Sequence, residues 1–534
     1  MKKFVCLLLV LILAVPAVAC GTDDSDDIDP TKTQLYIGII DGGLGDAWIN
    51  DLAAGFEELY KDYQGEGDKV GVQVKVDKQK EQFRGGTLIN NVAHNRQDIY
   101  FTEQIDYYQW VSRGLMLDVT DIVTGDLTAF GEEGTIEGKM HDADIAYLKY
   151  NEKYYALPFY SGYMTISYDV DLFEQNLLYF DDDGNFVTSL EDKSLGQDGR
   201  PRTYDDGLPL TYEQFFRLCA RIRALGMVPI NWAGGWQLYM TQLARSLYVD
   251  YEGYAQTMLN FNPVGTVDNY VTSVVPAADG NYIDTLVTQS EPINGDESKI
   301  FRQAGRYYAL SFVENIVRND FAHTLSFSPS EDFLTAQETF LYSTRRARAD
   351  DVAMFIDGSW WYNEADGVFT DMATAYPNSS ADERRIGIMP YPKATEEQLD
   401  QPTSLLMENE PLAFINAAIE PNKIDLAKAF MQYAATDAAL VRFTEITGVA
   451  RAFKYEMPED IFSGLNTFKR TSFEFLSSAE IVNPYTNTDY YREYADGNMW
   501  FYTTVNGQEH STPSTAFRNY TMTVEDYFNG LHQE

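Results

Sequence analysis

The chain has 534 residues, of which 45% are hydrophobic and 23% are charged. This length exceeds what one hydrophobic core supports and predicts two lobes, and the hydrophobic fraction excludes a disordered chain. Asp and Glu number 81 against 40 Lys and Arg, which gives a formal net charge of -41. Because a surface this acidic repels nucleic acid and anionic lipid, a nucleic-acid-binding function is excluded.

The first 19 residues have the pattern of a secretory signal peptide, with two lysines before an apolar run over residues 4–15. That run is too short to remain in a bilayer as a spanning helix. The small residues 17–19 lead directly into Cys20, and this junction resembles a bacterial lipobox, in which the cysteine is lipidated and becomes the N-terminus. We therefore predict a signal peptide over 1–19, a lipid on Cys20 and an acidic tether over residues 20–30.

A lipid on Cys20 would place the protein on the outer face of the bacterial cytoplasmic membrane. Such an anchor is typical of an envelope without a retaining outer compartment, so we expect a Gram-positive type of cell. After the signal peptide no run approaches the ~18 apolar residues of a membrane span, and the lipid is the expected membrane attachment. Cys6 lies in the predicted signal peptide and Cys20 is the predicted lipidation site, so Cys219 is the one cysteine left for the folded protein. We therefore expect no disulfide framework, and we expect Cys219 to be a buried small residue.

Residues 35–102 alternate between strand and helix patterns. The predicted order is a strand over 35–40, a helix from residue 46, a strand over 70–76, a helix over 81–94 and a strand over 98–102. This β-α-β-α-β order predicts a parallel, doubly wound sheet, in which ligands bind beyond the carboxyl ends of the strands. The loops that begin at Asp41 and Glu103 are therefore candidate ligand loops.

Further along the chain, the pattern predicts one insertion and three helices. Residues 181–206 are rich in Asp and Gly and predict a surface insertion, and the Asp-rich run over residues 181–185 within it predicts a solvated hairpin. A capping box at Thr211 predicts a helix that ends at Gly226. Two more amphipathic helices are predicted over residues 422–434 and 436–448.

Five stretches of the sequence carry one common resemblance. They are residues 98–119 with DIYF and GLMLDV, 154–173 with YYALP and ISYDVDLF, 210–215 with LTYEQF, 353–361 with AMFIDGSWW, and 414–450. Their order and spacing resemble the extracellular solute-binding proteins of sugar ABC importers, the family that contains the maltose-binding protein. One departure is Asp169, which stands where the family's Y-N-x-D-L-F pattern has Asn.

The resemblance implies an α/β fold of the type II periplasmic-binding-protein class. Such a fold has two lobes, each a mainly parallel sheet flanked by helices, joined by a multi-strand hinge. We expect residues 31–158 and 408–478 to form lobe 1, and residues 159–407 and 479–534 to form lobe 2, with hinge crossings at these boundaries.

The resemblance also implies a ligand site between the lobes. Sugars present flat patches of C–H groups and a fringe of hydroxyls, so their sites need aromatic faces and carboxylate or amide groups. By resemblance, Trp360 matches a tryptophan that stacks on a sugar ring, and Glu103 and Asp41 match carboxylates that bind hydroxyls. The alternative to a ligand role is burial in the core for Trp360, and stabilisation of a helix N-terminus for Glu103 and Asp41.

Five further candidates follow from their positions along the chain. Trp232 and Trp236 flank a glycine-rich loop after a predicted strand, and Tyr160 and Tyr163 follow the predicted interlobe strand. Arg451 lies just beyond a turn of small residues, where it could donate to a hydroxyl or pair with an acid. Buried packing is the alternative for the four aromatic residues.

The family resemblance implies a binding protein, not an enzyme, that captures a carbohydrate and delivers it to the permease subunits of an ABC importer. We expect a monomer with no cofactor, and no metal because the five histidines are scattered without ligand spacing. Two alternatives stay open. The same fold could bind a peptide or polyamine. An extracellular glycoside hydrolase would need two carboxylates about 5–10 Å apart, which a chain with 81 acids can always supply.

Overall fold

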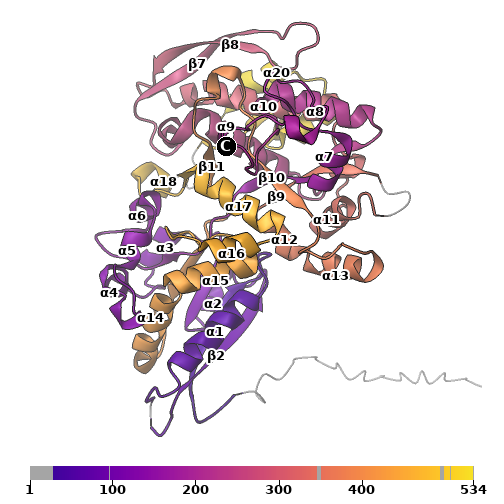
Figure 1. Cartoon of the computed structure of the whole chain (residues 1–534). Helices are drawn as coiled ribbons and strands as arrows, with labels where there is room; N and C mark the ends of the chain where they lie inside the picture. Colours follow the sequence, from indigo (N-terminus) through magenta and orange to yellow (C-terminus); the bar gives the residue numbers. More distant parts are fainter. Residues whose placement is uncertain are drawn as a thin grey trace, which may run out of the picture.

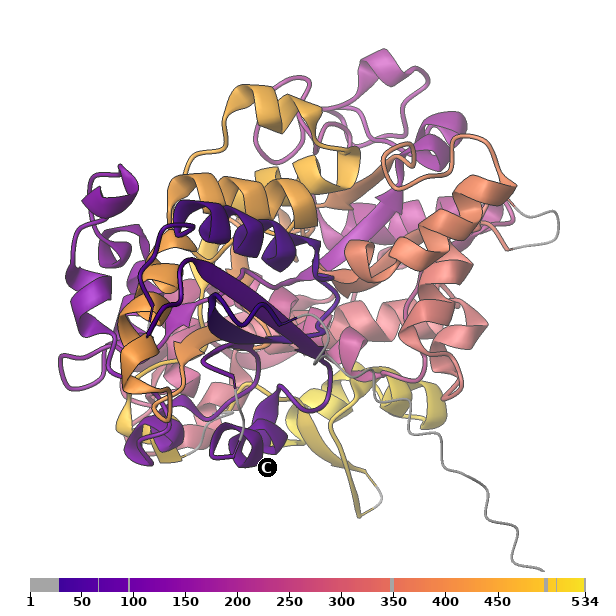
Figure 2. The ribbon, with the colours of Figure 1, turned by 90° about the horizontal axis from the view of Figure 1, so that it is seen from below.

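The computed structural model describes residues 28–65, 67–94, 97–345, 350–493, 498–505 and 507–532. The predicted signal peptide, Cys20 and the tether as far as residue 27 lie outside the described residues. Two α/β lobes are stacked on one another (Figure 1), and the view from below shows the first lobe, with its indigo strands, in front of the second (Figure 2). Among the helices of the described ranges, none combines the length and apolar character needed to cross a membrane.

The first lobe is built on a five-stranded sheet with the order β2-β1-β3-β12-β4. Its strands are β1 (Thr33–Ile40), β2 (Val72–Gln79), β3 (Ile99–Thr102), β4 (Leu157–Pro158) and β12 (Leu412–Ile415). β1 pairs in parallel with β2 and β3, which confirms the predicted β-α-β-α-β order. β12 comes from a distant part of the sequence, lies between β3 and β4, and runs antiparallel to both.

The helices of the first lobe are α1 (Ala47–Leu59), α2 (Gly85–Val92), α3 (Tyr107–Ser112), α4 (Thr120–Thr124), α5 (Ile136–Lys139), α6 (Asp142–Leu148), α14 (Ile424–Tyr433) and α15 (Asp437–Thr447). They include the four that the sequence predicts from residue 46, over 81–94, over 422–434 and over 436–448, which are α1, α2, α14 and α15. The Thr436 side chain accepts a hydrogen bond from the backbone N–H of Ala439 at the start of α15. Gly448 ends α15 at φ 72°, a left-handed conformation that favours glycine. The predicted helix over 436–448 is thereby confirmed.

The second lobe is built on a four-stranded sheet with the order β10-β5-β9-β6. Its strands are β5 (Met164–Asp169), β6 (Val228–Asn231), β9 (Val352–Gly358) and β10 (Ile386–Met389). β5 runs antiparallel to β10 and β9, and β6 runs parallel to β9. Each sheet therefore has one reversed strand, β12 in the first lobe and β5 in the second, so both sheets are mixed, and the predicted two-lobe α/β fold is confirmed.

Helices cover the second sheet and extend the lobe. They are α7 (Val170–Asn176), α8 (Tyr212–Ala224), α9 (Leu238–Thr257), α10 (Ala304–Arg318), α11 (Phe333–Leu341), α12 (Trp361–Glu364), α13 (Asp366–Ala375), α19 (Pro513–Asn519) and α20 (Val524–Asn529). The predicted helix between Thr211 and Gly226 is confirmed as α8, and the Thr211 side chain caps it. α9 packs against β5 and β9, and α11 packs against β9.

The second lobe carries a ribbon and an insertion beyond its main sheet. A long antiparallel ribbon, β7 (Thr266–Val275) and β8 (Thr285–Pro292), projects at the top of Figure 1 and was not predicted. The solvated hairpin predicted for residues 181–185 is confirmed, because Phe180 and Phe186 form an antiparallel bridge and the Asp181 N–H donates to Asn185 O at 2.8 Å. Further along the insertion, Asp205 is buried and accepts hydrogen bonds from the Asp198 backbone N–H and the Thr203 hydroxyl, both at 2.9 Å.

The hinge between the lobes consists of hydrogen-bonded segments that are distant in sequence. The Phe159 N–H donates to Pro411 O at 3.0 Å, and the Glu408 N–H donates to Gly162 O at 2.8 Å. Nearby, β11 (Ser404–Leu406) pairs in parallel with β13 (Glu480–Val482). These bonds join the crossing over residues 159–163 to the crossing over residues 407–411.

Helices α16 (Glu459–Gly464), α17 (Thr467–Ser478) and α18 (Asp489–Glu493) lie beside the hinge in Figure 1. α17 packs on β10 of the second sheet, where the Thr471 hydroxyl accepts the Ile388 N–H at 3.0 Å. The sequence prediction grouped residues 459–478 with the first lobe. In the structure, α17 also reaches the first lobe, because Lys469 Nζ donates to Ile446 O at 2.8 Å.

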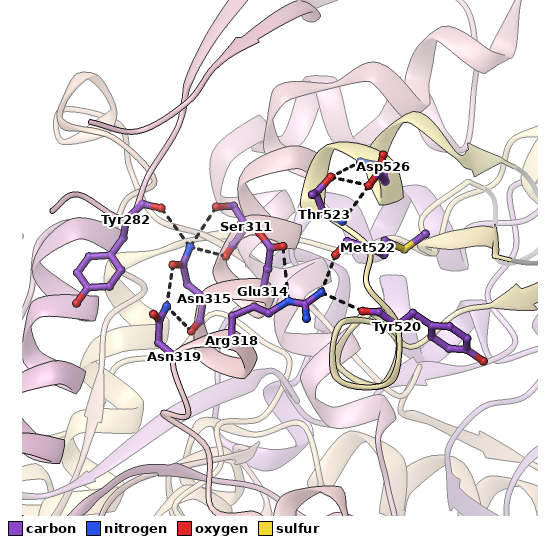
Figure 3. A network of polar contacts seen from close by, with 10 residues as sticks. All are labelled: Tyr282, Ser311, Glu314, Asn315, Arg318, Asn319, Tyr520, Met522, Thr523 and Asp526. Atoms are coloured by element: carbon purple, nitrogen blue, oxygen red, sulfur yellow. Dashed lines mark hydrogen bonds and ion pairs between the residues drawn. The ribbon is translucent and has the colours of Figure 1, made fainter. Parts of the chain in front are cut away.

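The C-terminal segment returns to the second lobe, where strands β14 (Tyr502–Val505), β15 (Gln508–His510) and β16 (Leu531–His532) form a small sheet. Arg318 at the end of α10 donates to Tyr520 O at 3.0 Å and Met522 O at 2.7 Å (Figure 3). Thr523 and Asp526 then form a capping box that begins α20. The described residues 498–505 and 507–532 therefore form part of the second lobe's packing.

Candidate functional site

A cavity of about 480 Å³ lies between the two lobes, beside the hinge. Its walls come from the loop after β3 and α3 in the first lobe, from α9 and Trp500 in the second lobe, and from the hinge segments. The lining residues are Gln104, Ile105, Asp106, Tyr107, Tyr108, Tyr147, Leu238, Gln242, Arg245, Phe261, Glu408, Asn409, Glu410, Pro484, Tyr485, Tyr491, Arg492 and Trp500. This volume lies within the range of small-molecule sites, roughly 300–1,000 Å³.

A charged pair in this cavity is only partly satisfied by the protein. Arg245 Nη1 lies 3.8 Å from Glu408 Oε2, and Gln242 Nε2 donates to the same oxygen at 3.4 Å. Glu408 Oε1 and Arg245 Nε are buried and have no hydrogen-bond partner in the described residues. Burial raises the pKa of Glu408, and the positive charge of Arg245 opposes that rise. Such buried donors and acceptors carry a desolvation cost that a polar ligand would offset.

Aromatic side chains surround this charged pair. The Arg245 guanidinium lies over the Trp500 ring at 4.3 Å, and the Tyr108 hydroxyl donates to Tyr147 O at 2.6 Å. Tyr147 in turn hydrogen-bonds Glu410. The cavity therefore combines flat apolar faces with a carboxylate, a guanidinium and amides.

Backbone strain is concentrated at the same place. Gln104, Asn409 and Glu410 line the cavity and have φ values of 55°, 71° and 45°, in the left-handed region that non-glycine residues rarely adopt. The Gln104 N–H donates to Asn409 O at 2.9 Å, so the first lobe is bonded to the strained hinge crossing. Strain of this kind is often found at ligand sites and switch regions.

Three predicted site residues meet in a second, solvent-poor cluster between the lobes. The Tyr160 hydroxyl donates to Glu103 Oε1 at 2.5 Å, and Glu103 also lies next to the backbone of Gly42. Trp360 of the second lobe is 7% exposed and lies against Gly43 of the first lobe. Asp41, at the start of the same loop, is half-exposed and lies 3.9 Å from Lys78 Nζ. The structure thus brings Glu103, Tyr160 and Trp360 together and places Asp41 at their edge.

Electrostatics in this cluster favour neutral carboxyl groups. Burial raises the pKa of Glu103 to about 7, although the Tyr160 hydrogen bond and the nearby Arg84 and Lys80 act against the rise. Burial and the neighbouring Glu364 raise the pKa of Asp357 well above its ordinary value. Lys80 of the first lobe lies 3.5 Å from Glu364 of the second, which partly balances the charge.

The side chains of the other predicted residues make their contacts outside both groups. Tyr163 is buried and donates to Ser472 O at 2.9 Å, and Trp232 is buried against Phe327. Trp236 is 47% exposed and precedes α9, which forms one cavity wall. Arg451 is buried in the first lobe, where its backbone forms a bridge with Tyr160. None of these four is among the residues that line the interlobe cavity.

Sequence reasoning missed most of the cavity. Trp500 fits the family pattern poorly, and Arg245 lies in the long helix α9, where periodicity gives no reason to expect a ligand group. Glu408 and Asn409 belong to a hinge crossing, and the one available signal for them was the hinge crossing predicted at the boundary between residues 407 and 408. In the described part of the chain, no group of three or more His, Cys, Asp or Glu side chains could hold a metal ion.

Comparison with protein families gives one match, to a family described as bacterial extracellular solute-binding protein, over residues 58–462. No curated protein matches the chain. Among solved structures, a chitin oligosaccharide binding protein is similar with 15% identity and a TM-score of 0.53, covering 90% of this chain and 92% of its own.

Two further solved structures share this similarity. RafE in complex with raffinose has 15% identity and a TM-score of 0.51, with 93% of this chain and 98% of its own covered. The cyclic alpha-maltosyl-1,6-maltose binding protein from Arthrobacter globiformis has 11% identity and a TM-score of 0.52, with 93% and 97% covered. At these identities the similarity establishes the fold, in agreement with the two lobes described above.

Proposed function

The chain belongs to the bacterial extracellular solute-binding proteins, and from this premise we propose that it captures a sugar or short oligosaccharide between its lobes. We propose further that it delivers this sugar to the permease subunits of an ABC importer. The single observation that carries the sugar proposal is the pair of unpartnered polar atoms, Glu408 Oε1 and Arg245 Nε, in an aromatic-walled cavity.

The chemistry of the cavity fits a polyhydroxylated ligand. A hydroxyl group both donates and accepts, so neighbouring hydroxyls can donate to Glu408 Oε1 and accept from Arg245 Nε in one orientation. Hydrogen bonds to charged groups contribute about 1.5–3 kcal/mol each, which is enough to set orientation and specificity. The tyrosine and tryptophan rings supply faces for the C–H patches of a sugar ring. The names of the similar structures, which bind chitin oligosaccharide, raffinose or maltosyl-maltose, support the same ligand class.

Contacts between the lobes support a closure mechanism. Lys80 and Glu364 form an ion pair across the cleft, Trp360 lies against Gly43, and Asn363 hydrogen-bonds Thr447 O. A ligand that contacts both lobes binds the closed form more tightly than the open form and shifts the population toward it. The closed lobes then present a composite surface to the permease. In this proposal Glu103, Asp41 and Trp360 belong to the closing surface that borders the ligand.

The proposal places the protein outside the cell, held by a lipid on Cys20. Cys20 lies outside the described residues, and the support is the signal-peptide pattern together with the family's extracellular location. Tethering raises the effective concentration of the binder at its permease. Replacement of Cys20 by Ala should release the protein into the medium, whereas the wild-type protein should remain in the membrane fraction.

A thermal-shift screen against monosaccharides, oligosaccharides, peptides and polyamines tests the proposal. A ligand at 100 times its dissociation constant should add about 2.7 kcal/mol to the apparent free energy of unfolding. We expect this for a sugar that is recovered chemically unchanged. A thermal shift with peptides or polyamines alone would show that the ligand is not a sugar. Recovery of a cleaved sugar would show that the protein is a hydrolase.

A further inference from the structure

Arg451 is a buried cation without an acidic partner. It is 3% exposed, and its guanidinium carbon lies 5.2–6.0 Å from the rings of Phe443, Phe159, Phe453 and Phe101. In the described residues its Nε has no hydrogen-bond partner. Burial lowers the pKa of Arg451 to about 10, so the group stays charged at neutral pH. Tyr455 opposes this lowering, but aromatic rings are no counter-ion, and a buried charge among them carries a large desolvation cost.

Other buried arginines of the chain have polar partners. Arg384 lies 3.1 Å from Asp169 Oδ2, and Arg306 Nη2 donates to Asn260 Oδ1 at 2.6 Å. Arg245 has Glu408 at 3.8 Å. Cation–π contacts contribute about 0.5–2 kcal/mol each and do not replace a counter-ion in a dry environment. The position of Arg451 therefore calls for an anion that the protein itself does not provide.

A cavity of about 270 Å³ between α1 and α15 reaches this side chain. It is lined by Trp48, Asp51, Leu52, Tyr433, Ala438, Ala439, Arg442, Phe443 and Arg451. The Trp48 ring packs on Phe101, Phe159 and Phe443 at 5.2–5.3 Å, and these are three of the rings around the guanidinium. The charged end of Arg451 therefore lies on the side of this cavity.

The charges that face the cavity favour an anion. Asp51, its one acid, accepts hydrogen bonds from Arg442 at 2.9 and 3.1 Å, and Arg442 also contacts Glu445. Ala438 and Ala439 belong to the first turn of α15, where Glu132 already accepts the Asp437 N–H and Thr436 accepts the Ala439 N–H. With Asp51 paired to Arg442, Arg451 is the cation in the wall of this cavity for which the described residues provide no acid.

We propose that this cavity binds a small monovalent anion, chloride in size and charge, as the counter-ion of Arg451. Its apolar walls of tryptophan, leucine and phenylalanine suit a weakly hydrated ion, and its single unpaired cation suits a single charge. The site lies directly behind the first hinge crossing, because the backbone of Arg451 bridges Tyr160. Occupation of the cavity therefore stabilises the first lobe and the hinge crossing together.

Bromide substitution tests the site on the intact protein. Crystals grown with sodium bromide should show an anomalous peak in the cavity, within hydrogen-bond distance of the Arg451 guanidinium. No peak in this cavity would overturn the proposal. This measurement needs no variant and is independent of the sugar site.

A solution measurement provides the second test. At constant ionic strength, replacement of gluconate by chloride should raise the Tm of the protein by about 2 °C or more. Arg451→Met should lose this response, and Arg223→Met, which changes a surface arginine of the second lobe, should keep it. The proposal would be overturned if Arg451→Met showed the same rise of Tm with chloride as the wild type. It would also be overturned if the variant had a higher Tm than the wild type in chloride, because either result would mean that the charge has no bound counter-ion.

Discussion

The Tyr160 hydroxyl donates a 2.5 Å hydrogen bond to Glu103 Oε1, which joins the first hinge crossing to the carboxyl end of β3, the central strand of the first lobe's sheet. Both residues are buried between the lobes, next to the loop that carries Gly42 and Gly43. The bond therefore links the hinge crossing to a carboxyl group whose pKa burial raises to about 7.

Stability should fall as the pH rises through the range in which Glu103 ionises. Burial raises its pKa from 4.5 to about 7, so between these values the folded state holds more protons than the unfolded state. Rising pH then lowers the free energy of unfolding, by at most about 3 kcal/mol from this group. Glu103→Gln keeps an acceptor for Tyr160 but does not titrate.

Urea unfolding at pH 5 and pH 7.5 checks this expectation. Burial also raises the pKa values of Asp144 and Glu252 to about 7, and these two residues contribute equally to the pH dependence of stability in the wild type and in Glu103→Gln. The loss of stability between the two pH values should be smaller in Glu103→Gln than in the wild type. An unchanged difference would show that Glu103 is not the titrating group.

Gly43 should be needed for closure, and Gly45 provides a matched control. Both have positive φ, 89° and 68°, so alanine costs backbone energy at each, about 1 kcal/mol. A Cβ at Gly43 would lie 3.1 Å from Trp360 Cδ1 across the cleft, whereas one at Gly45 would meet nothing within 4 Å. Gly43→Ala should weaken ligand binding and leave the protein more open in small-angle X-ray scattering. Equal affinities of the two variants would rule out this interlobe contact as a determinant of closure.

The ion pair between Lys80 and Glu364 should favour the closed form modestly. Lys80 Nζ lies 3.5 Å from Glu364 Oε1 and 4.3 Å from the Phe333 ring, both in the second lobe. Lys78 instead contacts Asp41 and Asp46 of its own lobe. Because Lys80 is partly exposed, Lys80→Met should lower ligand affinity by about two- to fivefold, and Lys78→Met should not. Calorimetric titration measures both, and a loss of equal size in Lys78→Met would point to general charge effects.

The buried pair of Asp169 and Arg384 should be essential to the second lobe. Arg384 Nη2 donates to Asp169 Oδ2 at 3.1 Å, and Asp169 Oδ1 caps α7 by accepting the Leu172 N–H. Asp169→Asn keeps the cap but leaves Arg384 unpaired, which should cost about 3–5 kcal/mol of unfolding free energy. The double variant Asp169→Asn with Arg384→Met should recover part of this loss in denaturant unfolding. No recovery would assign the cost to packing and not to charge.

Local patterns predicted much of the fold. The strands and helices between residues 35 and 102, the start of α8 at Thr211 and the end of α15 at Gly448 follow from periodicity and caps within a few residues. The insertion of β12 between β3 and β4 could not be read in this way, because it depends on pairing across some 300 residues. The same reason applies to Arg384, whose partner Asp169 was visible only as a departure from a family pattern.

The site was predictable in part. Family resemblance placed Glu103 and Trp360 in the cleft, and Tyr160 was a candidate because it follows the predicted interlobe strand. The structure brings the three together, but as a tightly packed closing surface. The open cavity instead depends on Arg245, Glu408 and Trp500, which come from a helix, a hinge crossing and the C-terminal segment. No local pattern signals that such residues converge, because their approach is decided by how the lobes pack.

Calorimetric titration of an oligosaccharide found in the thermal-shift screen into wild type, Glu408→Gln and Glu252→Gln tests the central claim most directly. Glu252 is also buried in the second lobe but does not line the cavity. We predict one binding site, an affinity about tenfold or more weaker in Glu408→Gln because a charged hydrogen bond is lost, and an unchanged affinity in Glu252→Gln. Equal affinities in all three proteins would contradict a sugar site in this cavity.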